Sequence, residues 1–267
     1  MTKVRRLTLD DLPACTALAK DRDWQPEDRK WRLLFDLGEV YGIDAEDGDG
    51  LAATNVVTFY GPERAVISMV LTASRYGRRG LGRQLMDHVL SRAQGAVVSL
   101  SATEYGRPLY EKHGFKTVGT MVTHKGFFTG RPSGTTRVAD DLGAVIAYDT
   151  PRFGADRSKV LLSGYHQQIR VASDGDRITG FGGMWRAHDH LTIGPVVADD
   201  EDTARALIAD LAAGAEEPVR LDLDQARPGL VAWAEANGVP YYFTTSTMVH
   251  GGELSGEPYL PTMQALG

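Results

Sequence analysis

Glycines and arginines that could bind an anion stand close together in the first half of the chain. The glycines are Gly77, Gly80 and Gly82, and the arginines are Arg75, Arg78, Arg79 and Arg83. Glycine lets a ligand approach the backbone closely, and the first N–H groups of a helix have no partners inside that helix. A helix that starts at these glycines would offer backbone donors and a favourable dipole to phosphate groups. The pattern therefore predicts a diphosphate-binding loop.

An apolar strand and an amphipathic helix must position this loop. Residues 66–72 read as the strand, and Leu81, Leu85 and Val89 recur at the spacing of one buried helix face. The nucleoside triphosphate loop is excluded because its Gly-Lys-Ser/Thr sequence is absent, and the dinucleotide fingerprint would need a glycine where Leu85 stands. A strand-to-helix turn without a ligand would show the same glycine spacing. The arginines and a downstream Gly-Phe favour a ligand site.

The elements expected around this loop alternate between strands and helices up to a linker. We expect strands at 4–8, 40–44, 51–60, 96–101 and 115–123, and helices from Asp10 or Asp11 to about Lys20, from Pro26 to Leu37, and in a short segment before Gly114. Residues 46–50 read as a turn. Residues 129–136 contain no large apolar residue and carry several helix and strand breakers, so they are typical of a linker.

Beyond the linker the order of elements repeats. We expect strands at 142–149, 169–172, 178–186, 191–197 and 219–223, and helices at 151–164, 203–213 and 229–236. Val70-Leu71-Thr72 can be laid over Val196-Val197-Ala198, and Gly114 then falls on Gly238 with a gap of two residues. Two unrelated α/β units could look alike at this level, but the shared anchors favour two copies of one domain.

These residues resemble the GNAT superfamily of N-acetyltransferases. The cofactor motif of that family is Gln/Arg-x-x-Gly-x-Gly/Ala, in which Gly80 and Gly82 match the last positions and Gly77 replaces the first. A second family motif, an asparagine ahead of Leu-Tyr-x-x-x-Gly-Phe, is matched by residues 109–115, with Thr103 at the asparagine position. Residues 102–110, 149–157 and 193–195 are similar to a bacterial subgroup that carries a second GNAT-like domain.

The resemblance implies an α/β (α+β) fold with tandem GNAT-like domains, each a mixed, mostly antiparallel central sheet flanked by helices. Residues 1–130 would form the catalytic domain and residues 137–267 a degenerate one. Acetyl-CoA would be the co-substrate, and an amine of a small molecule or protein would be the acceptor. The residues expected to bind the cofactor are Val70, Leu71, Thr72, Arg78, Arg79, Gly80, Leu81, Gly82, Arg83 and Thr103. Tyr110 would protonate the departing thiolate as a general acid.

A general base is not identified by the sequence. Glu104 and His124 lie close enough in sequence, but each reads equally as an ordinary surface or strand residue, and water could accept the proton. Trp24 and Trp31 flank the second helix, where the family commonly builds the acceptor pocket, and we expect at least one of them to pack in the core. The run from His188 to His190 lacks further ligands, so we expect no metal site.

The second copy lacks the features of the first at the corresponding positions. Its phosphate loop is replaced by Asp199-Asp200-Glu201-Asp202, and Ala234 stands where Tyr110 would be. These carboxylates would repel a diphosphate, although they suit a helix N-terminus. We expect this copy to have lost cofactor binding and kept the fold. It would cover the acceptor site, complete the core, or form an oligomer contact such as a homodimer interface.

Composition limits the remaining functional classes. A length of 267 residues fits one large domain or two ordinary ones, and a net charge of −6 argues against a nucleic-acid partner. The chain has no apolar run near the ~18 residues of a membrane span and no apolar run of signal-peptide length at its start, so we expect no membrane partner. The single cysteine, Cys15, shares a helical stripe with Leu12 and Leu18, which predicts a buried thiol and a cytoplasmic protein.

The resulting hypothesis is an acetyl-CoA-dependent N-acetyltransferase. A non-catalytic acyl-CoA-binding or sensing module is the alternative, because the family asparagine is missing and no base is identified. A transferase for another acyl group, or for an oxygen acceptor, is also compatible with these residues.

Overall fold

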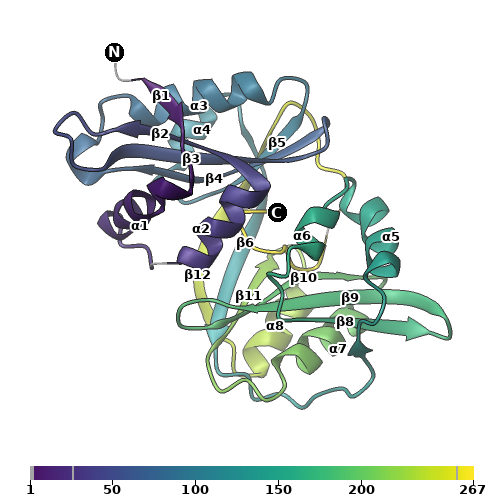
Figure 1. The fold of residues 1–267 in the computed structure, drawn as a ribbon. Coiled ribbons are helices and arrows are strands. Elements are labelled where there is room, and N and C mark those ends of the chain that lie inside the picture. The colour runs from purple at the N-terminus through teal and green to yellow at the C-terminus, as the bar shows by residue number, and fades with distance from the viewer. Residues whose placement is uncertain (1–2, 26, 257) are drawn as a thin grey trace.

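Within the residues that the computed structural model describes, 3–25, 27–256 and 258–267, twelve strands form one continuous sheet (Figure 1). The strands are β1 (Val4–Arg6), β2 (Gly38–Asp44), β3 (Leu51–Tyr60), β4 (Arg64–Thr72), β5 (Val97–Ala102), β6 (Lys116–Gly126), β7 (Arg137–Val138), β8 (Gln168–Asp174), β9 (Arg177–Arg186), β10 (Leu191–Ala198), β11 (Val219–Asp224) and β12 (Tyr241–His250). Their order in the sheet is β1-β2-β3-β4-β5-β12-β6-β11-β10-β9-β8-β7.

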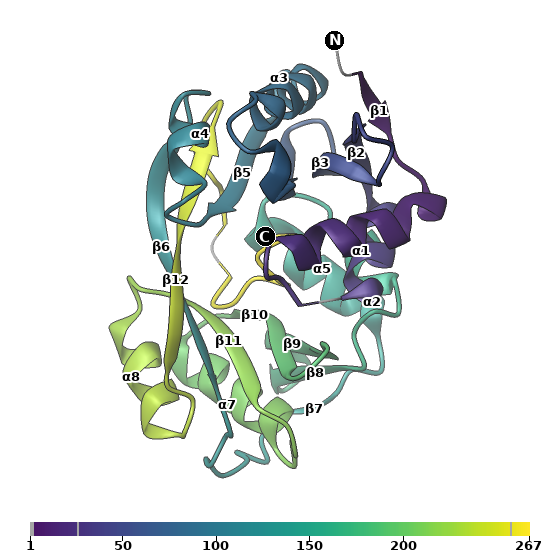
Figure 2. The ribbon, with the colours of Figure 1, turned by 90° about the vertical axis from the view of Figure 1, so that its left-hand side faces the viewer.

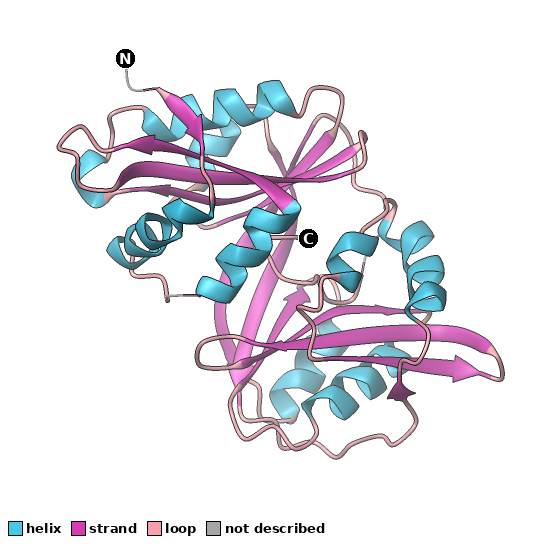
Figure 3. Ribbon diagram, in the orientation of Figure 1, coloured by secondary structure: helices cyan, strands magenta, loops and turns pink. Residues whose placement is uncertain are grey.

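Helices cover both faces of each half of this sheet (Figure 3). They are α1 (Leu12–Asp21), α2 (Asp28–Leu37), α3 (Leu81–Arg92), α4 (Arg107–Glu111), α5 (Leu142–Phe153), α6 (Ser158–Leu162), α7 (Glu201–Ala212) and α8 (Pro228–Ala236). The expected apolar face of α3 is confirmed, because Leu81, Leu85 and Val89 are all buried against the sheet. Pro26, expected at the start of α2, lies outside the described residues.

The two halves repeat one topology. The order β3-β4-α3-β5-α4-β6 in the first half recurs as β9-β10-α7-β11-α8-β12 in the second. β4 is antiparallel to β3 and parallel to β5, and β10 is likewise antiparallel to β9 and parallel to β11. Gly114 and Gly238, the glycines expected to correspond, both have positive φ after α4 and α8. The expected mixed, mostly antiparallel strand arrangement is confirmed, although the strands of both halves form one continuous sheet.

The last strands of the two halves are exchanged. β12 lies between β5 and β6, and β6 lies between β12 and β11, so each half's final strand pairs with a strand of the other half. Figure 2 shows β6 and β12 running side by side from one half to the other. No strand is predicted for residues 241–250, although their aromatic and β-branched side chains favour one; only their pairing partners lack a local signal.

The expected strand at residues 142–149 is wrong, because these residues form the first part of α5. Asp141 caps this helix by accepting hydrogen bonds from the N–H groups of Gly143 and Ala144. Val145 and Tyr148 are buried at helical spacing, so one face of the helix packs on the sheet. The helix expected at 151–164 is two helices, since α5 ends where Gly154 adopts a φ of 78° and α6 follows.

A buried ion pair of the second half lies next to its contact with the first half. Arg157 and Asp149 are 0% and 1% exposed and form a bidentate pair with N–O distances of 2.8 and 2.7 Å. The Phe153 ring lies against the guanidinium groups of both Arg157 and Arg64, at 4.1 and 3.8 Å. Arg64, the first residue of β4, also donates to the carbonyl oxygens of Phe153 and Ser255. Burial lowers the pKa of Arg64 to about 10.

Residues 258–267 run between the two halves, where Figure 1 labels the C-terminal end. Tyr259 donates its N–H to the carbonyl of Val196 in β10, and Val196 donates to the carbonyl of Leu260. At the other end of this tail, the Leu266 carbonyl accepts a 2.7 Å hydrogen bond from the Tyr60 hydroxyl of β3. The tail therefore joins β10 of the second half to β3 of the first.

Replacing Arg157 with methionine should lower the free energy of unfolding by about 3–5 kcal/mol, because Asp149 would keep a buried charge without its partner. As a control, Arg137→Met breaks an exposed pair with Asp140 and should cost less than about 1 kcal/mol. Denaturant unfolding followed by circular dichroism measures both variants. Equal losses in the two would contradict a stabilising role for the buried pair.

Candidate active site

The expected phosphate loop ends at an open helix N-terminus. Gly80 precedes α3 with a φ of 81°, a conformation that suits glycine. Because glycine has no side chain, no side-chain oxygen caps the first N–H groups of the helix. The carbonyl of Gly80 accepts from the N–H of Gln84 at 3.0 Å, which closes the first turn of the helix. The N–H groups of Leu81, Gly82 and Arg83 precede this bond and point along the helix axis, as a bound anion requires.

Gly82 is the point where three elements meet. A Cβ atom placed on Gly82 would lie 3.3 Å from Cδ2 of Leu109 in α4 and 3.7 Å from Oγ1 of Thr72 at the end of β4. Glycine leaves room at this meeting point, where a Cβ would be slightly tight against Leu109. The structure thus brings Thr72 and Gly82, both expected to bind the cofactor, to one place.

Acidic residues partly neutralise the arginines of the loop. Ion pairs join Arg75 to Asp47, Arg79 to Glu46 and Arg83 to Asp87. Glu46 and Asp47 belong to the expected turn at residues 46–50, so this turn lies beside the loop. Arg78 has a φ of 63° and is exposed, and it has no carboxylate partner within the described residues. The positive charge available to a ligand is smaller than the sequence alone indicates.

β4 and β5 separate beyond their first residues. Their parallel pairing runs from Arg64 opposite Val97 to Val66 opposite Ser99, and stops there among the strands that the structure describes. Further along β4 the register shifts against β3, and Met69 adopts a φ of 50°. The β5 side of residues 70–72 is therefore free of strand pairing. We call the gap between β4 and β5 beyond Val66 the slot.

Tyr110 lies in α4 beside Gly106 and Thr103. A Cβ atom on Gly106 would lie 3.1 Å from the Tyr110 ring, 3.4 Å from its hydroxyl and 3.4 Å from the Thr103 hydroxyl. The ring packs edge-on against Phe115, with centroids 6.1 Å apart, and burial raises the pKa of Tyr110 to about 12. Thr103 accepts a 3.2 Å hydrogen bond from the N–H of Gly106, so its side chain shapes the turn before α4.

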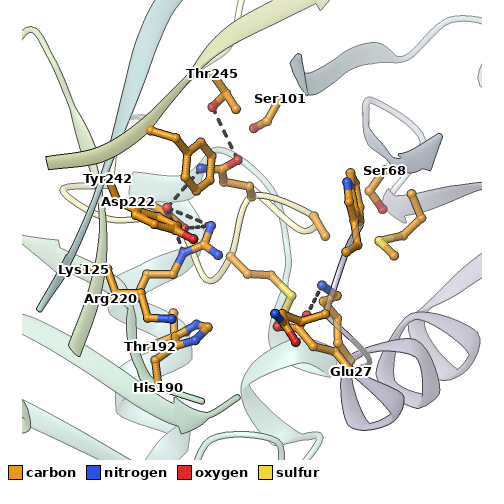
Figure 4. A pocket seen from close by; sticks show the side chains of 18 of the residues that line it. Glu27, Ser68, Ser101, Lys125, His190, Thr192, Arg220, Asp222, Tyr242 and Thr245 are labelled. Atoms are coloured by element: carbon orange, nitrogen blue, oxygen red, sulfur yellow. Dashed lines mark hydrogen bonds and ion pairs between the residues drawn. The ribbon is translucent and has the colours of Figure 1, made fainter. Parts of the chain in front are cut away.

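A cavity of about 610 Å³ lies between the two halves (Figure 4). Ser68 and Met69 of β4, Ser101 of β5 and Thr103 line it on the side of the first half. These residues flank the slot, so the cavity opens where the slot begins. Trp24, 40% exposed, also lines the cavity, whereas Trp31 is 1% exposed and belongs to the core. The prediction that at least one of these tryptophans packs in the core is confirmed.

One row of side chains on the sheet forms the opposite wall of the cavity. Trp185 of β9 lies opposite Thr192 of β10, Thr192 opposite Arg220 of β11, and Arg220 opposite Lys125 of β6. Side chains at registered positions point to the same face of a sheet. All four residues line the cavity. The sequence predicts these strands but not this wall; the alternation of polar and apolar residues over 220–223 is the signal that could have indicated its β11 part.

The wall and its surroundings carry paired charges. Lys125 contacts Asp189 at 2.8 Å, and Arg220 contacts Asp222 at 3.0 Å. Gln264 of the tail donates to Asp222 at 3.0 Å and extends this network into the cavity. Across the cavity, Glu27 forms an ion pair with Lys30 in the first turn of α2.

The two candidate bases are not brought to the cavity. Glu104 is exposed and does not line it. His124 is 1% exposed, and its Nδ1 lies 3.0 Å from the carbonyl of Val239, so it is a core residue. Cys15 is fully buried as predicted, and burial raises the pKa of its thiol to about 12.

Neither a metal-binding cluster nor a membrane-spanning helix is found in the described part of the chain. Within residues 3–25, 27–256 and 258–267, no group of three or more histidine, cysteine or acidic side chains is arranged to hold a metal ion. Over the same residues, no helix combines the length and apolar character needed to cross a membrane.

In the second half, the positions that correspond to the loop and the slot are filled. Asp200 caps α7 by accepting a 2.7 Å hydrogen bond from the N–H of Thr203, and Asp199 pairs with Arg152 and Arg177. Residues 259–262 of the tail enter beside β10, where a Cβ on Gly194 would overlap the carbonyl of Pro261. This arrangement agrees with the expected loss of cofactor binding in the second copy.

Comparisons with known proteins agree with this architecture. Two family models, each described as an acetyltransferase (GNAT) domain, match residues 51–129 and 145–258, which together make up well over half of the chain. The Bacillus subtilis protein YitH, an uncharacterized N-acetyltransferase, is 28% identical over 206 residues, which cover 73% of this chain and 72% of YitH.

Solved structures show the same fold over the whole chain. A putative acetyltransferase from Pyrococcus horikoshii superposes with a TM-score of 0.86 at 18% identity, covering 100% of this chain and 96% of that one. A tandem GNAT protein from the clavulanic acid biosynthesis pathway gives a TM-score of 0.65 at 11% identity, covering 95% and 100%. The family models and the repeated topology lead to one conclusion: the chain belongs to the GNAT acetyltransferases and carries two GNAT-like domains in tandem.

Proposed function

We propose that this acetyltransferase moves an acetyl group from acetyl-CoA to an amine that binds in the cavity between the halves. The observation that carries the proposal is the continuity of three features. The open N–H groups at the start of α3 lie at one end of β4, the slot follows β4, and the cavity begins at Ser68 and Ser101. Such a path suits a long donor with a diphosphate at one end and a thioester at the other.

The residues along this path match the chemical parts of the donor. The N–H groups of Leu81, Gly82 and Arg83, with Arg78 and Arg79 nearby, suit the diphosphate. The unpaired backbone edge of residues 70–72 suits the amide groups of the pantetheine arm. Thr103, in place of the family asparagine, lines the cavity, and its hydroxyl and that of Tyr110 each lie 3.4 Å from the Cβ position of Gly106. Acetyl-CoA supplies an activated thioester to this site.

Tyr110 is proposed as the general acid. A carbon–nitrogen bond forms as the neutral amine attacks the thioester carbonyl, and the carbon–sulfur bond then breaks. The Tyr110 hydroxyl donates its proton to the departing sulfur; like any tyrosine it is protonated at neutral pH, and burial raises its pKa further, to about 12. Neither Glu104 nor His124 lines the cavity, which favours water there as the acceptor of the amine proton.

The second half is proposed as a cover for the acceptor, not as a second catalytic unit. We assign the donor site to the domain at residues 1–130 and regard residues 137–267 as the degenerate copy, whose β12 completes the sheet beside β5. The capped α7 and the tail beside β10 support one donor molecule per chain.

Gly80→Asp should weaken CoA binding at least about 10-fold, because a carboxylate would face the diphosphate at the helix N-terminus. Gly95→Asp is the matched control, since Gly95 also has a positive φ, of 88°, and open space around its Cβ position, but lies beyond the other end of α3. Titration calorimetry with CoA compares the variants with the parent protein, whose expected stoichiometry is one. Equal affinities for CoA in the two variants would mean that the loop is assigned wrongly.

Tyr110→Phe should lower turnover by about 100-fold or more while leaving the affinity for CoA unchanged, because the thiolate would leave without a proton donor. The Tyr110 hydroxyl has no hydrogen-bond partner within the described residues, so its removal should not destabilise the fold. Thiol release from acetyl-CoA measures the turnover, and a thermal unfolding curve measures the stability of the fold. Turnover within a factor of about two of the parent would rule out this role.

Gly106→Ala should also reduce turnover without weakening CoA binding, because its Cβ would displace the Tyr110 ring. The backbone at Gly106, with φ −80° and ψ −27°, accepts alanine without strain. If the effect acts through Tyr110, Gly106→Ala should add little to the loss already present in Tyr110→Phe. If the double variant instead shows the product of the two single losses of turnover, Gly106 does not act through Tyr110.

A further inference from the structure

Two buried polar atoms on the wall of the cavity have no partner within the described residues. They are Oγ1 of Thr192 and Nε2 of His190, in residues that are 2% and 6% exposed. Both residues line the cavity. A buried polar group without a hydrogen bond costs about 1–3 kcal/mol, so such groups usually have a partner in the protein, in ordered water or in a ligand. Because these two atoms face the cavity, both are available to a polar part of a ligand.

The carboxylates around the cavity are already engaged. Asp222 accepts hydrogen bonds from Arg220, Thr123 and Gln264, and Asp189 accepts from Lys125 and His190. The bonds from Lys125 and His190 lower the pKa of Asp189 to about 2, so it stays ionised and paired. Glu27 pairs with Lys30. Among the described residues that line the cavity, each carboxylate already has a cationic partner, which disfavours a second ammonium group on the acceptor.

Hydrogen-bond donors, in contrast, remain available on the wall. Arg220 uses Nε and Nη2 on Asp222, and its Nη1 has no partner within the described residues. The ammonium of Lys125 has three N–H donors and contacts one carboxylate, that of Asp189. Arg220 lies opposite Lys125 on one side and opposite Thr192 on the other. Donors from β6, β11 and β10 thus stand in one row, a few ångströms apart.

His190 adds one acceptor to these donors. Its Nδ1 lies 2.7 Å from a carboxylate oxygen of Asp189 and therefore carries the proton, which leaves Nε2 with a lone pair. Burial lowers the pKa of His190, so the ring is neutral. A wall with three donors and one acceptor matches a carboxylate that has an O–H or N–H group beside it.

The two ends of the cavity differ in chemistry. Figure 4 shows His190, Thr192 and Arg220 on one side and Ser68 on the opposite side. Under the proposed function, on which this inference rests, the amine must lie on the Ser68 side, where the slot opens. We propose that the acceptor is an amino acid-like molecule whose carboxylate binds the row formed by Lys125, Arg220 and Thr192, at the end remote from the reacting amine.

Matched acceptors test this assignment. Omega-amino acids of increasing chain length, their primary amides and the diamines of the same length present one amine with an anionic, neutral or cationic far end. With acetyl-CoA as donor, the acids should exceed the amides and diamines in kcat/KM by about 10-fold or more, the value of one charge-assisted hydrogen bond. Equal or better use of the amides or diamines would overturn the proposal.

Two variants connect the preference to the wall. Lys125→Met and Thr192→Val should each reduce the ratio of acid to amide kcat/KM, and neither should change the affinity for CoA. Thr58→Val is the matched control, because the Thr58 hydroxyl is also buried without a partner among the described residues but does not line the cavity. A ratio that stays at the parent value in Lys125→Met and Thr192→Val would contradict the assignment.

A binding measurement separates this proposal from the proposed function. The N-acetylated omega-amino acids and their amides cannot be acetylated again at the same amine, so their binding can be measured without a reaction. The fluorescence of Trp24 and Trp185, which line the cavity, reports this binding. If no amine is acetylated, the proposed function fails, yet tighter binding of the acids than of the amides, weakened by Lys125→Met, would still support a carboxylate site. Equal binding of both would refute it.

Discussion

The hydrogen-bonded pairing of β12 with β5 is the interaction on which the rest of the molecule depends. Ser246 to His250 pair with Val98 to Ala102, and β6 then carries the sheet on from β12 to β11. This ladder fixes the distance and angle between the slot of the first half and the row that contains Lys125 and Arg220. The buried pair of Asp149 and Arg157, with Phe153 against Arg64, holds the same two halves on the side of α5.

The two copies differ in structure at equivalent places. Where the first copy leaves backbone N–H groups open at α3, the second closes them with Asp200, and where β4 parts from β5, the tail fills the space beside β10. Backbone groups in a protein interior must find partners, so a slot without a ligand needs such a filling. Away from this filled position, the sheet of the second half supplies Thr192 and Arg220, in register with Lys125 of β6, to the wall of the cavity.

The sequence predicts the parts of this structure that depend on local signals. Glycine at positions 80 and 82, the apolar stripe from Leu81 to Val89 and the repeated element order follow from spacing, and the structure and the comparisons confirm the fold. The helix at 142–153 reads as a strand because its β-branched and aromatic residues suit both, and the cap at Asp141 decides the outcome. β12 and the cavity wall depend on pairing between residues far apart in the chain, such as Ser246 with Ala102, which no local pattern encodes.

The exchange of strands also bears on how the polypeptide acquires its shape on the ribosome. Until residues 241–250 have been synthesised, the edge of β5 that pairs with β12 lacks this partner strand. The donor-binding half therefore gains its last strand neighbour only from the end of the chain, which differs from the domain-by-domain order common for larger chains. Pairing over so large a sequence separation is of the kind that slows folding.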